Sequence, residues 1–178
     1  MKILSSGELS LRPFREDDRN ILVQIADNQN VSKYLAPRFP YPYTLEDADD
    51  WLAMTRNEEP PLNFAIEWRG QFVGGIGLEP HSGLFARTAE LGYWLGEPYW
   101  GRGLTAKAVE LIIPYAFGDL SFIRLQAIIF FENHQSRRVL EKNGFIKEGV
   151  LRKHISKNGV ITDAMLYARL ASEGADQC

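Results

Sequence analysis

The chain has 178 residues, 20 basic and 23 acidic side chains, and a single cysteine, Cys178. This length fits about one domain of roughly 150 residues, and a hydrophobic content of 45% excludes a disordered chain. A net charge of −3 argues against general nucleic-acid binding, the lone cysteine excludes an internal disulfide and a CxxC redox motif, and no apolar run approaches the ~20 residues that span a bilayer. We therefore expect a cytoplasmic protein with neither a nucleic-acid partner nor a membrane.

The first half of the chain combines short strands with two helices. Glu8–Phe14 alternates apolar and polar residues and predicts a strand, and Arg15–Asp18 supplies cap residues for a helix after it. Thr44–Asp47 resembles a capping box that opens a second helix. Two runs then predict a hairpin over 64–78, turning at Arg69-Gly70, and Thr88–Leu95 predicts a further strand.

The second half predicts two more helices and three more strands. A helical period begins at Leu104, and Pro114 should kink its last turns. Arg124–Phe131 is nearly all apolar, which predicts a strand buried on both faces. Asn133–Asn143 predicts a helix ended by Gly144, and Asn158-Gly159 predicts the turn of a last hairpin.

The resulting order, β-α-α-β-β-β-α-β-α-β-β, favours one mixed α/β domain over residues 1–170. Residues 171–178 (ASEGADQC) are expected to form a frayed, disordered tail.

The segment from Tyr99 to Ala106 (YWGRGLTA) lies between a predicted strand and a predicted helix. Gly101 and Gly103 permit backbone angles that other residues avoid, and the start of the helix offers N–H groups and a positive dipole end to a phosphate. Arg102 adds a charge. A tight turn without a ligand explains the two glycines equally well, because GxG alone is a weak signal and the segment is neither a P-loop nor a Rossmann fingerprint.

This turn lies within a longer string, AELGYWLGEPYWGRGLTAKA, and a second string, NHQSRRVLEKNGFIKEG, follows further along the chain. Together with the opening LRPFREDD, they resemble the GNAT superfamily of acyl-CoA-dependent N-acetyltransferases, in the branch of the RimJ/RimL-type enzymes that acetylate ribosomal-protein N-termini. The resemblance runs from about Leu9 to Leu170. It implies the GNAT N-acyltransferase fold, an α/β (α+β) fold with a mixed, mostly antiparallel central sheet that is splayed at the cofactor site and flanked by helices.

The resemblance implies acetyl-CoA as the co-substrate and names the residues that hold it. Main-chain N–H groups of the glycine turn should cradle the pyrophosphate; the matching residues are Trp100, Gly101, Arg102, Gly103, Leu104 and Thr105. Trp100 and Thr105 depart from the general pattern, which has Arg or Gln and Gly or Ala there. Backbone groups of Trp94 and Leu95 should hold pantetheine, and one N–H should face the thioester oxygen.

Asn133 and Ser136 lie three apart at the start of a predicted helix, so they are neighbours on one face. From the residues alone, helix capping by Asn133 is the simpler explanation. The resemblance instead implies that Asn133 contacts the pantetheine arm and that Ser136 lies near the thioester sulfur. Some relatives place a tyrosine acid where this chain has Leu140, so Ser136 is the candidate proton donor.

Glu90 is the candidate base, since it lies on the motif strand, although it also fits an exposed strand carboxylate. Tyr93 is a second possibility, on the opposite face. A base matters because a lysine-like amine with a pKa of ~10.4 costs ~4.6 kcal/mol to deprotonate at pH 7, against ~1.4 kcal/mol for an α-amine near 8. His134 adjoins the helix start and should face solvent. The other histidines, His81 and His154, are isolated, and no metal site is expected.

The acceptor pocket of this fold is lined by the loop between the first two helices and by the last hairpin, here Tyr34–Tyr43 and Lys153–Asp163. Phe39, Tyr41 and Tyr43 either contact the substrate or pack as a lid over the core. The acidic residues of 46–50 would attract a cationic amine, but their helical spacing fits a solvated face as well.

These observations favour an acetyl-CoA-dependent N-acetyltransferase that acts by direct attack of a primary amine. A protein N-terminal amine is the acceptor that the branch implies, and antibiotics, polyamines and amino acids are the alternatives. A catalytically idle acyl-CoA-binding module is a further alternative, which Leu140 slightly favours. A homodimer is plausible by family likeness.

Overall fold

The computed structural model describes residues 2–172, which form two compact units. The N-terminal unit contains the described residues up to Gly77 together with Tyr93–Ile112, and the C-terminal unit contains Leu78–Gly92 and the described residues from Ile113. Apart from Ala171 and Ser172, the expected tail 171–178 lies outside the described residues, as does Cys178.

The N-terminal unit contains a series of antiparallel strand pairs: β1 (Leu4–Ser6), β2 (Leu9–Arg12), β3 (Asn63–Trp68) and β4 (Gln71–Pro80). The predicted strand at 8–14 and the predicted hairpin at 64–78 are confirmed. Strand β1 was not predicted, because its three residues are largely exposed and show no apolar alternation.

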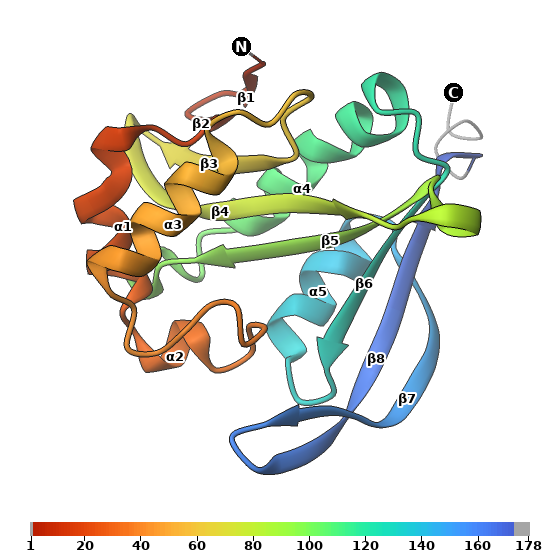
Figure 1. Ribbon diagram of the computed structural model, residues 1–178. Helices are drawn as coiled ribbons and strands as arrows, with labels where there is room; N and C mark the ends of the chain where they lie inside the picture. The colour runs from red at the N-terminus through yellow and green to blue at the C-terminus, as the bar shows by residue number, and fades with distance from the viewer. Residues whose placement is uncertain (1, 173–178) are drawn as a thin grey trace. The chain divides into compact units, whose positions relative to one another are not determined.

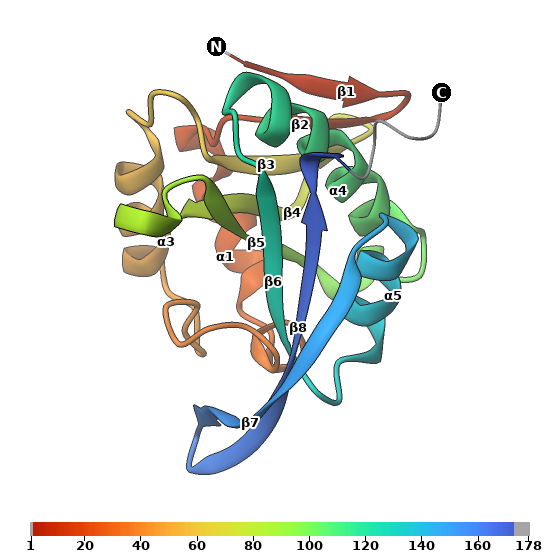
Figure 2. The same cartoon turned by 90° about the vertical axis from the view of Figure 1, so that its right-hand side faces the viewer.

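Helices cover both sides of these strands. They are α1 (Arg19–Ala26), the short α2 (Gln29–Ser32), α3 (Leu45–Thr55) and the first residues of α4 (Leu104–Pro114). Figures 1 and 2 show α3 and α4 on opposite sides of β3 and β4. The predicted capping box is present: the Thr44 hydroxyl accepts the Asp47 N–H at 3.2 Å, and the Asp47 carboxylate accepts the Thr44 N–H at 2.7 Å.

The opening motif LRPFREDD has a structural role at the end of β2. The buried Arg12 guanidinium donates two hydrogen bonds to Asp18, of 2.8 and 2.7 Å, and one of 2.6 Å to Glu67. Burial by itself would lower the pKa of Arg12, but the hydrogen bonds to the two carboxylates outweigh it and raise that pKa. Asp18 belongs to a 3₁₀ turn (Glu16–Asp18), so the ion pair joins β2 to the start of α1.

In the C-terminal unit, β6 (Arg124–Phe130) pairs in parallel with β5 (Thr88–Leu95) and antiparallel with β8 (Val160–Leu170). Strand β8 also pairs with β7 (Ile146–Lys157). The parallel ladder covers three residue pairs and ends at Glu90 and Gln126, while both strands run on beyond it. Figure 2 shows β6 and β8 side by side, with α5 (His134–Lys142) beside β7.

The prediction that Arg124–Phe131 is buried on both faces is wrong. Burial alternates along β6: Leu125, Ala127 and Ile129 are buried, whereas the residues between them are only partly covered. An apolar run cannot distinguish a doubly buried strand from one whose second face is half open.

Three local predictions in this part of the chain are confirmed. The α-helix ends at Pro114 and continues as one π-helical stretch, Tyr115–Asp119, since proline removes a backbone donor. Gly144 adopts φ = 75° after α5, and Asn158 and Gly159 adopt φ = 51° and 78° at the turn between β7 and β8.

Candidate functional site

The glycine turn has the backbone geometry that its sequence predicts. Gly101 and Gly103 adopt φ = 74° and 73°, in the left-handed region that side chains disfavour, and both are exposed. A short 3₁₀ turn (Glu97–Tyr99) comes before them, and α4 follows at once; Lys107 donates to the Gly103 carbonyl at 3.2 Å. In an α-helix the first N–H groups have no acceptor in the helix itself, so this turn presents main-chain donors and a positive dipole end.

A Cβ placed on Gly101 or Gly103 meets no atom within 4 Å. The space over the turn is therefore open, and the glycines serve the backbone angle and not close packing within the protein. An exposed turn of two left-handed glycines that opens an 11-residue helix has the geometry of an anion site, such as one for a phosphate group.

Two asparagines support the 3₁₀ turn from α2. Asn28 and Asn30 donate side-chain hydrogen bonds of 2.7 and 3.0 Å to the Glu97 carboxylate, and these bonds hold the pKa of Glu97 below its usual value. Asn28 also caps α2 through its Oδ1. The sequence did not predict the short helix α2. Its asparagines fix the 3₁₀ turn that comes directly before the glycine turn.

The end of β5 is held against β4 by close backbone packing. A Cβ on Gly74 would lie 2.3 Å from the Trp94 carbonyl oxygen and 2.9 Å from the Leu95 Cα, so only glycine fits. The Trp100 indole donates a 2.7 Å hydrogen bond to the Leu95 carbonyl. Trp100, which replaces the usual Arg or Gln of the resemblance, thus joins the glycine turn to the end of β5.

The three predicted acceptor-loop aromatics differ in exposure. Tyr43 is buried, with 5% of its surface exposed, and belongs to a hydrophobic cluster with α1, α3, β3 and β4. Phe39 contacts Tyr43 and Trp94 at ring centroid distances of 5.1 and 5.0 Å. Tyr41 is 54% exposed. Tyr43 and Phe39 therefore pack in the core of the N-terminal unit, and contact of Tyr41 with a substrate stays a prediction.

Burial, with a smaller contribution from the Asp47 charge, raises the pKa of Tyr43 to about 12. The phenol therefore stays protonated at physiological pH.

Asn133 is the N-cap of α5, as the simpler explanation predicted. Its Oδ1 accepts the Ser136 backbone N–H at 3.1 Å. Capping uses only the oxygen, so the Nδ2 group keeps its two N–H donors for another acceptor. The two residues are neighbours and both are half-buried. Leu140, at the position of the tyrosine acid of some relatives, is fully buried and serves the core.

Glu90 and His81 lie close together in the C-terminal unit. The His81 Nε2 is 4.0 Å from the Glu90 carboxylate, and 32% and 37% of the two side chains are exposed. The backbone N–H of His81 donates to the Thr88 carbonyl at 2.9 Å, which holds the residue beside β5. The position of His81 in the sequence indicated an isolated histidine, but in the structure it lies beside Glu90. His134, in contrast, is exposed as predicted.

The acidic residues at the start of α3 lie on a solvated helix face, which is one of the two interpretations that their spacing allowed. Asp49 is exposed and forms an ion pair with Arg19. The hydrogen bond that the Arg19 guanidinium donates in this pair lowers the pKa of Asp49. Glu46 and Asp50 are exposed too.

Within residues 2–172 there is no group of three His, Cys, Asp or Glu side chains that is placed to hold a metal ion. Across the same residues, no helix has the length and apolar character to cross a membrane.

Comparisons with known proteins agree with the resemblance drawn from the two sequence strings. The family described as "Acetyltransferase (GNAT) domain" matches residues 8–146. The uncharacterized N-acetyltransferase p20 of Bacillus licheniformis is 28% identical over 184 residues, which cover 98% of this chain and 99% of that protein. Spermidine N(1)-acetyltransferase of Escherichia coli (strain K12) is 27% identical over 148 residues, covering 83% of this chain and 77% of that one.

Among solved structures, that of Mycobacterium smegmatis RimJ in complex with CoA-disulfide is similar with a TM-score of 0.81 and 26% identity, over 97% of this chain and 88% of that one. These matches confirm the expected fold, a mixed α/β fold with mostly antiparallel strands flanked by helices, and the resemblance to RimJ/RimL-type enzymes.

Proposed function

The chain belongs to the GNAT acetyltransferase family, and on this premise we propose that it transfers the acetyl group of acetyl-CoA to a protein N-terminal amine. The observation that carries the coenzyme assignment is the exposed glycine turn with two left-handed residues at the start of α4. The solved RimJ relative, which is in complex with CoA-disulfide, supports the same co-substrate. A cytoplasmic location remains a prediction from the sequence.

In this proposal the coenzyme is bound mainly by backbone groups of the chain. Main-chain N–H groups of Trp100–Thr105 bind the pyrophosphate, and Arg102 adds positive charge at its edge. Backbone groups of Trp94 and Leu95 and the Nδ2 of Asn133 bind the pantetheine arm. Acetyl-CoA supplies an acyl group that is already activated as a thioester, so the protein mainly has to orient an amine and remove its proton.

Glu90 is the proposed base. The amine nitrogen bonds to the acetyl carbon as the carbon–sulfur bond breaks, and the proton of the amine passes to the Glu90 carboxylate. Ser136 donates a hydrogen bond to the departing sulfur, and the second proton that the nitrogen loses as it becomes an amide passes to that sulfur. No cysteine of the described residues can form an acyl intermediate, because the single cysteine of the chain is Cys178. Direct attack is therefore the proposed route.

The acceptor amine is proposed from chemistry and branch likeness. An α-amine with a pKa near 8 costs ~1.4 kcal/mol to deprotonate at pH 7, whereas a lysine-like or polyamine nitrogen costs ~4.6 kcal/mol. The α-amine therefore asks less of a general base than the polyamine nitrogen does. The spermidine acetyltransferase among the relatives supports the alternative, a small-molecule amine.

The deciding experiment measures thiol release from acetyl-CoA with a panel of amines: N-terminal peptides, spermidine, free amino acids and aminoglycosides. Turnover that is fastest with peptides supports the proposal. Faster turnover with a small amine supports the alternative acceptor. A flat panel despite tight binding of coenzyme A would show an idle binding module.

Glu90→Gln tests the role of the base in the same assay. We expect kcat/KM to fall about 100-fold at pH 7, and the loss to shrink as the pH approaches the pKa of the amine, because the amine then loses its proton without help. Glu79→Gln, an exposed carboxylate on β4, is the matched control and should leave the pH profile unchanged. An unchanged profile in Glu90→Gln would remove Glu90 as the base.

A further inference from the structure

Strand β7 carries a bulge of three residues. Leu151 and Ile155 pair with Ala164 and Thr162, so the three residues 152–154 stand opposite a single residue of β8. Extra residues in one strand bend it and re-aim its side chains, and such bulges are frequent next to active sites. The bulge therefore sets the side chains of residues 152–154 in directions that a regular strand would not give them.

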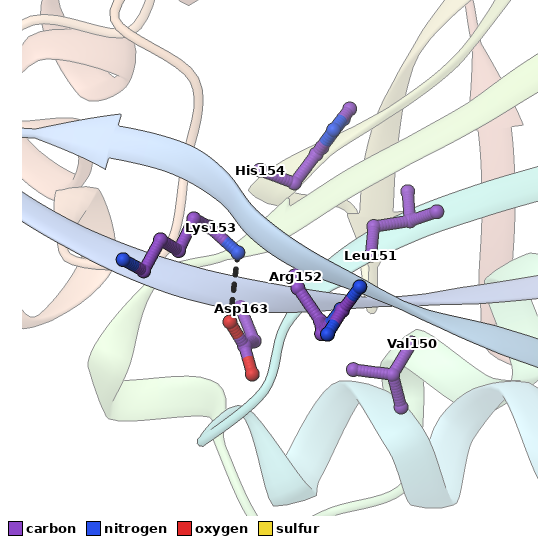
Figure 3. A pocket seen from close by; sticks show the side chains of 6 residues that line it. All are labelled: Val150, Leu151, Arg152, Lys153, His154 and Asp163. Carbon is purple, nitrogen blue, oxygen red and sulfur yellow. Dashed lines mark hydrogen bonds between the residues drawn. The ribbon is translucent and has the colours of Figure 1, made fainter.

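The residues in the bulge are Arg152, Lys153 and His154, and all three are exposed. They line an open cavity of about 760 Å³ together with Val150, Leu151 and Asp163. Asp163, the carboxylate in this lining, accepts the Lys153 backbone N–H at 2.8 Å (Figure 3), so one of its oxygens is committed to holding the bulge. The cavity is thus lined by two fixed positive charges, one histidine and one partly engaged carboxylate.

Lys153 adopts φ = 52°, in the left-handed region. A side chain there costs roughly 1–2 kcal/mol relative to glycine. A few residues further on, the same hairpin uses Asn158 and Gly159 for φ = 51° and 78°, which are the residues that tolerate this region. Arg69 and Ser121 adopt φ = 52° and 57° elsewhere in the chain, so the left-handed angle at Lys153 is a feature of the bulged backbone.

The bulge is close to the proposed reaction residues of the C-terminal unit. The Asp163 carbonyl accepts the Phe131 N–H at 3.1 Å, and Phe131 is followed by the turn that leads to Asn133 and α5. In that turn Glu132 accepts the Thr162 hydroxyl at 3.0 Å, so this carboxylate is engaged as well. A group bound at the bulge would therefore lie beside the segment that carries Asn133 and Ser136.

We propose that the bulge 152–154 binds a carboxylate of the acceptor, so that the acceptor is a peptide with acidic side chains close behind its N-terminal amine. Arg152 and Lys153 supply the positive charge, and His154 adds to it when protonated. The inference rests on the proposed function, and it excludes a polyamine, whose charges the two cations would repel.

The test uses three peptides with the same first residue, followed by acidic, neutral or basic residues, and spermidine and an acidic amino acid beside them. The double variant Arg152→Gln, Lys153→Gly removes both charges, and glycine keeps the left-handed backbone without strain. Lys142→Gln, at the exposed end of α5, is the control of equal charge type. Thermal unfolding and calorimetric binding of coenzyme A show whether the variants remain folded and loaded.

We expect the acidic peptide to have the lowest KM, which rises about tenfold in the double variant and with added salt, since the contact is a charge pair at a partly open site. The KM of the neutral peptide should change less than twofold, and coenzyme A binding should not change. Equal KM values for the acidic and neutral peptides overturn the inference, and so does a preference for spermidine. The proposed function is judged separately, because it stands as long as the neutral peptide is acetylated. If peptides are not acetylated but the acidic amino acid is, with the same dependence on Arg152 and Lys153, the carboxylate site stands and the peptide acceptor fails.

Discussion

The end of β5 in the N-terminal unit and the bulge of β7 in the C-terminal unit are built by opposite means. Around Trp94 the chain is fixed by close packing. The Trp94 ring centroid lies 5.0 Å from that of Phe39 and 6.0 Å from that of Phe72, and Gly74 lets the backbones of β4 and β5 approach closely. The bulge instead displays exposed charges on a backbone to which one carboxylate is hydrogen-bonded.

This difference matches the tasks that we propose for the two regions. The coenzyme is the same molecule in every turnover, so the groups that bind it gain from a backbone that is fixed by packing. An acceptor is selected among many amines, and charge gives selectivity without close packing. The two regions should therefore respond differently to the same kinds of change, and four predictions follow from the largest expected effect to the smallest.

Gly74→Ala should produce the largest loss of stability. The added Cβ would overlap the Trp94 carbonyl and the Leu95 Cα, which are backbone atoms that cannot turn aside, so we expect a loss of about 3 kcal/mol. Gly149→Ala on β7 is the control, because its Cβ would meet nothing within 4 Å. Denaturant unfolding measures both variants. Equal losses would show that β5 is not held by this contact.

High pH should weaken the N-terminal unit through Tyr43. Its pKa is about 12 in the folded protein because of burial, and about 10 in the unfolded chain. Between these values the unfolded chain has released the proton while the folded protein keeps it, so stability falls as pH rises, by at most about 3 kcal/mol. Unfolding at pH 9 and pH 11.5 should show this decline. A variant with Tyr43→Phe should lack that share of it, and an identical decline in both proteins would contradict the burial of the phenol.

Gly103→Ala should weaken coenzyme A binding about tenfold at a stability loss of roughly 1 kcal/mol, because alanine resists φ = 73° and shifts the donors of the turn. Gly159→Ala, at φ = 78° in the last hairpin, imposes a similar strain away from the turn. It should leave coenzyme A affinity unchanged in calorimetry. If both variants bind equally well, the glycine turn is not the pyrophosphate site.

Asp163→Ala should have the smallest effect on stability, about 1 kcal/mol, since it removes one hydrogen bond to the Lys153 N–H in an exposed bulge. Asp163→Asn keeps an oxygen acceptor and should retain most of that stability. Hydrogen exchange at the Lys153 amide follows the bulge directly. Unchanged exchange in Asp163→Ala would show that the carboxylate does not hold it.

Most of the local structure was predictable because it depends on residues close together in the chain. The Thr44–Asp47 capping box, the left-handed Gly144 and the Asn158-Gly159 turn each follow from backbone rules that act within a few residues. The glycine turn belongs to the same group, since its two left-handed residues need glycine whatever surrounds them. The sequence alone thus determined most of the elements, with β1 and α2 as exceptions, together with the family resemblance and the candidate coenzyme turn.

Only the tertiary structure decided the relations between distant residues. It joined Trp100 to the Leu95 carbonyl, placed His81 beside Glu90, buried Tyr43 while leaving Tyr41 exposed, and opened one face of β6. It also gathered Arg152, Lys153 and His154 into one bulge opposite Asp163. Pairing partners across a sheet, and the burial that follows from them, depend on how strands far apart in the chain align, and local residue patterns do not encode that alignment.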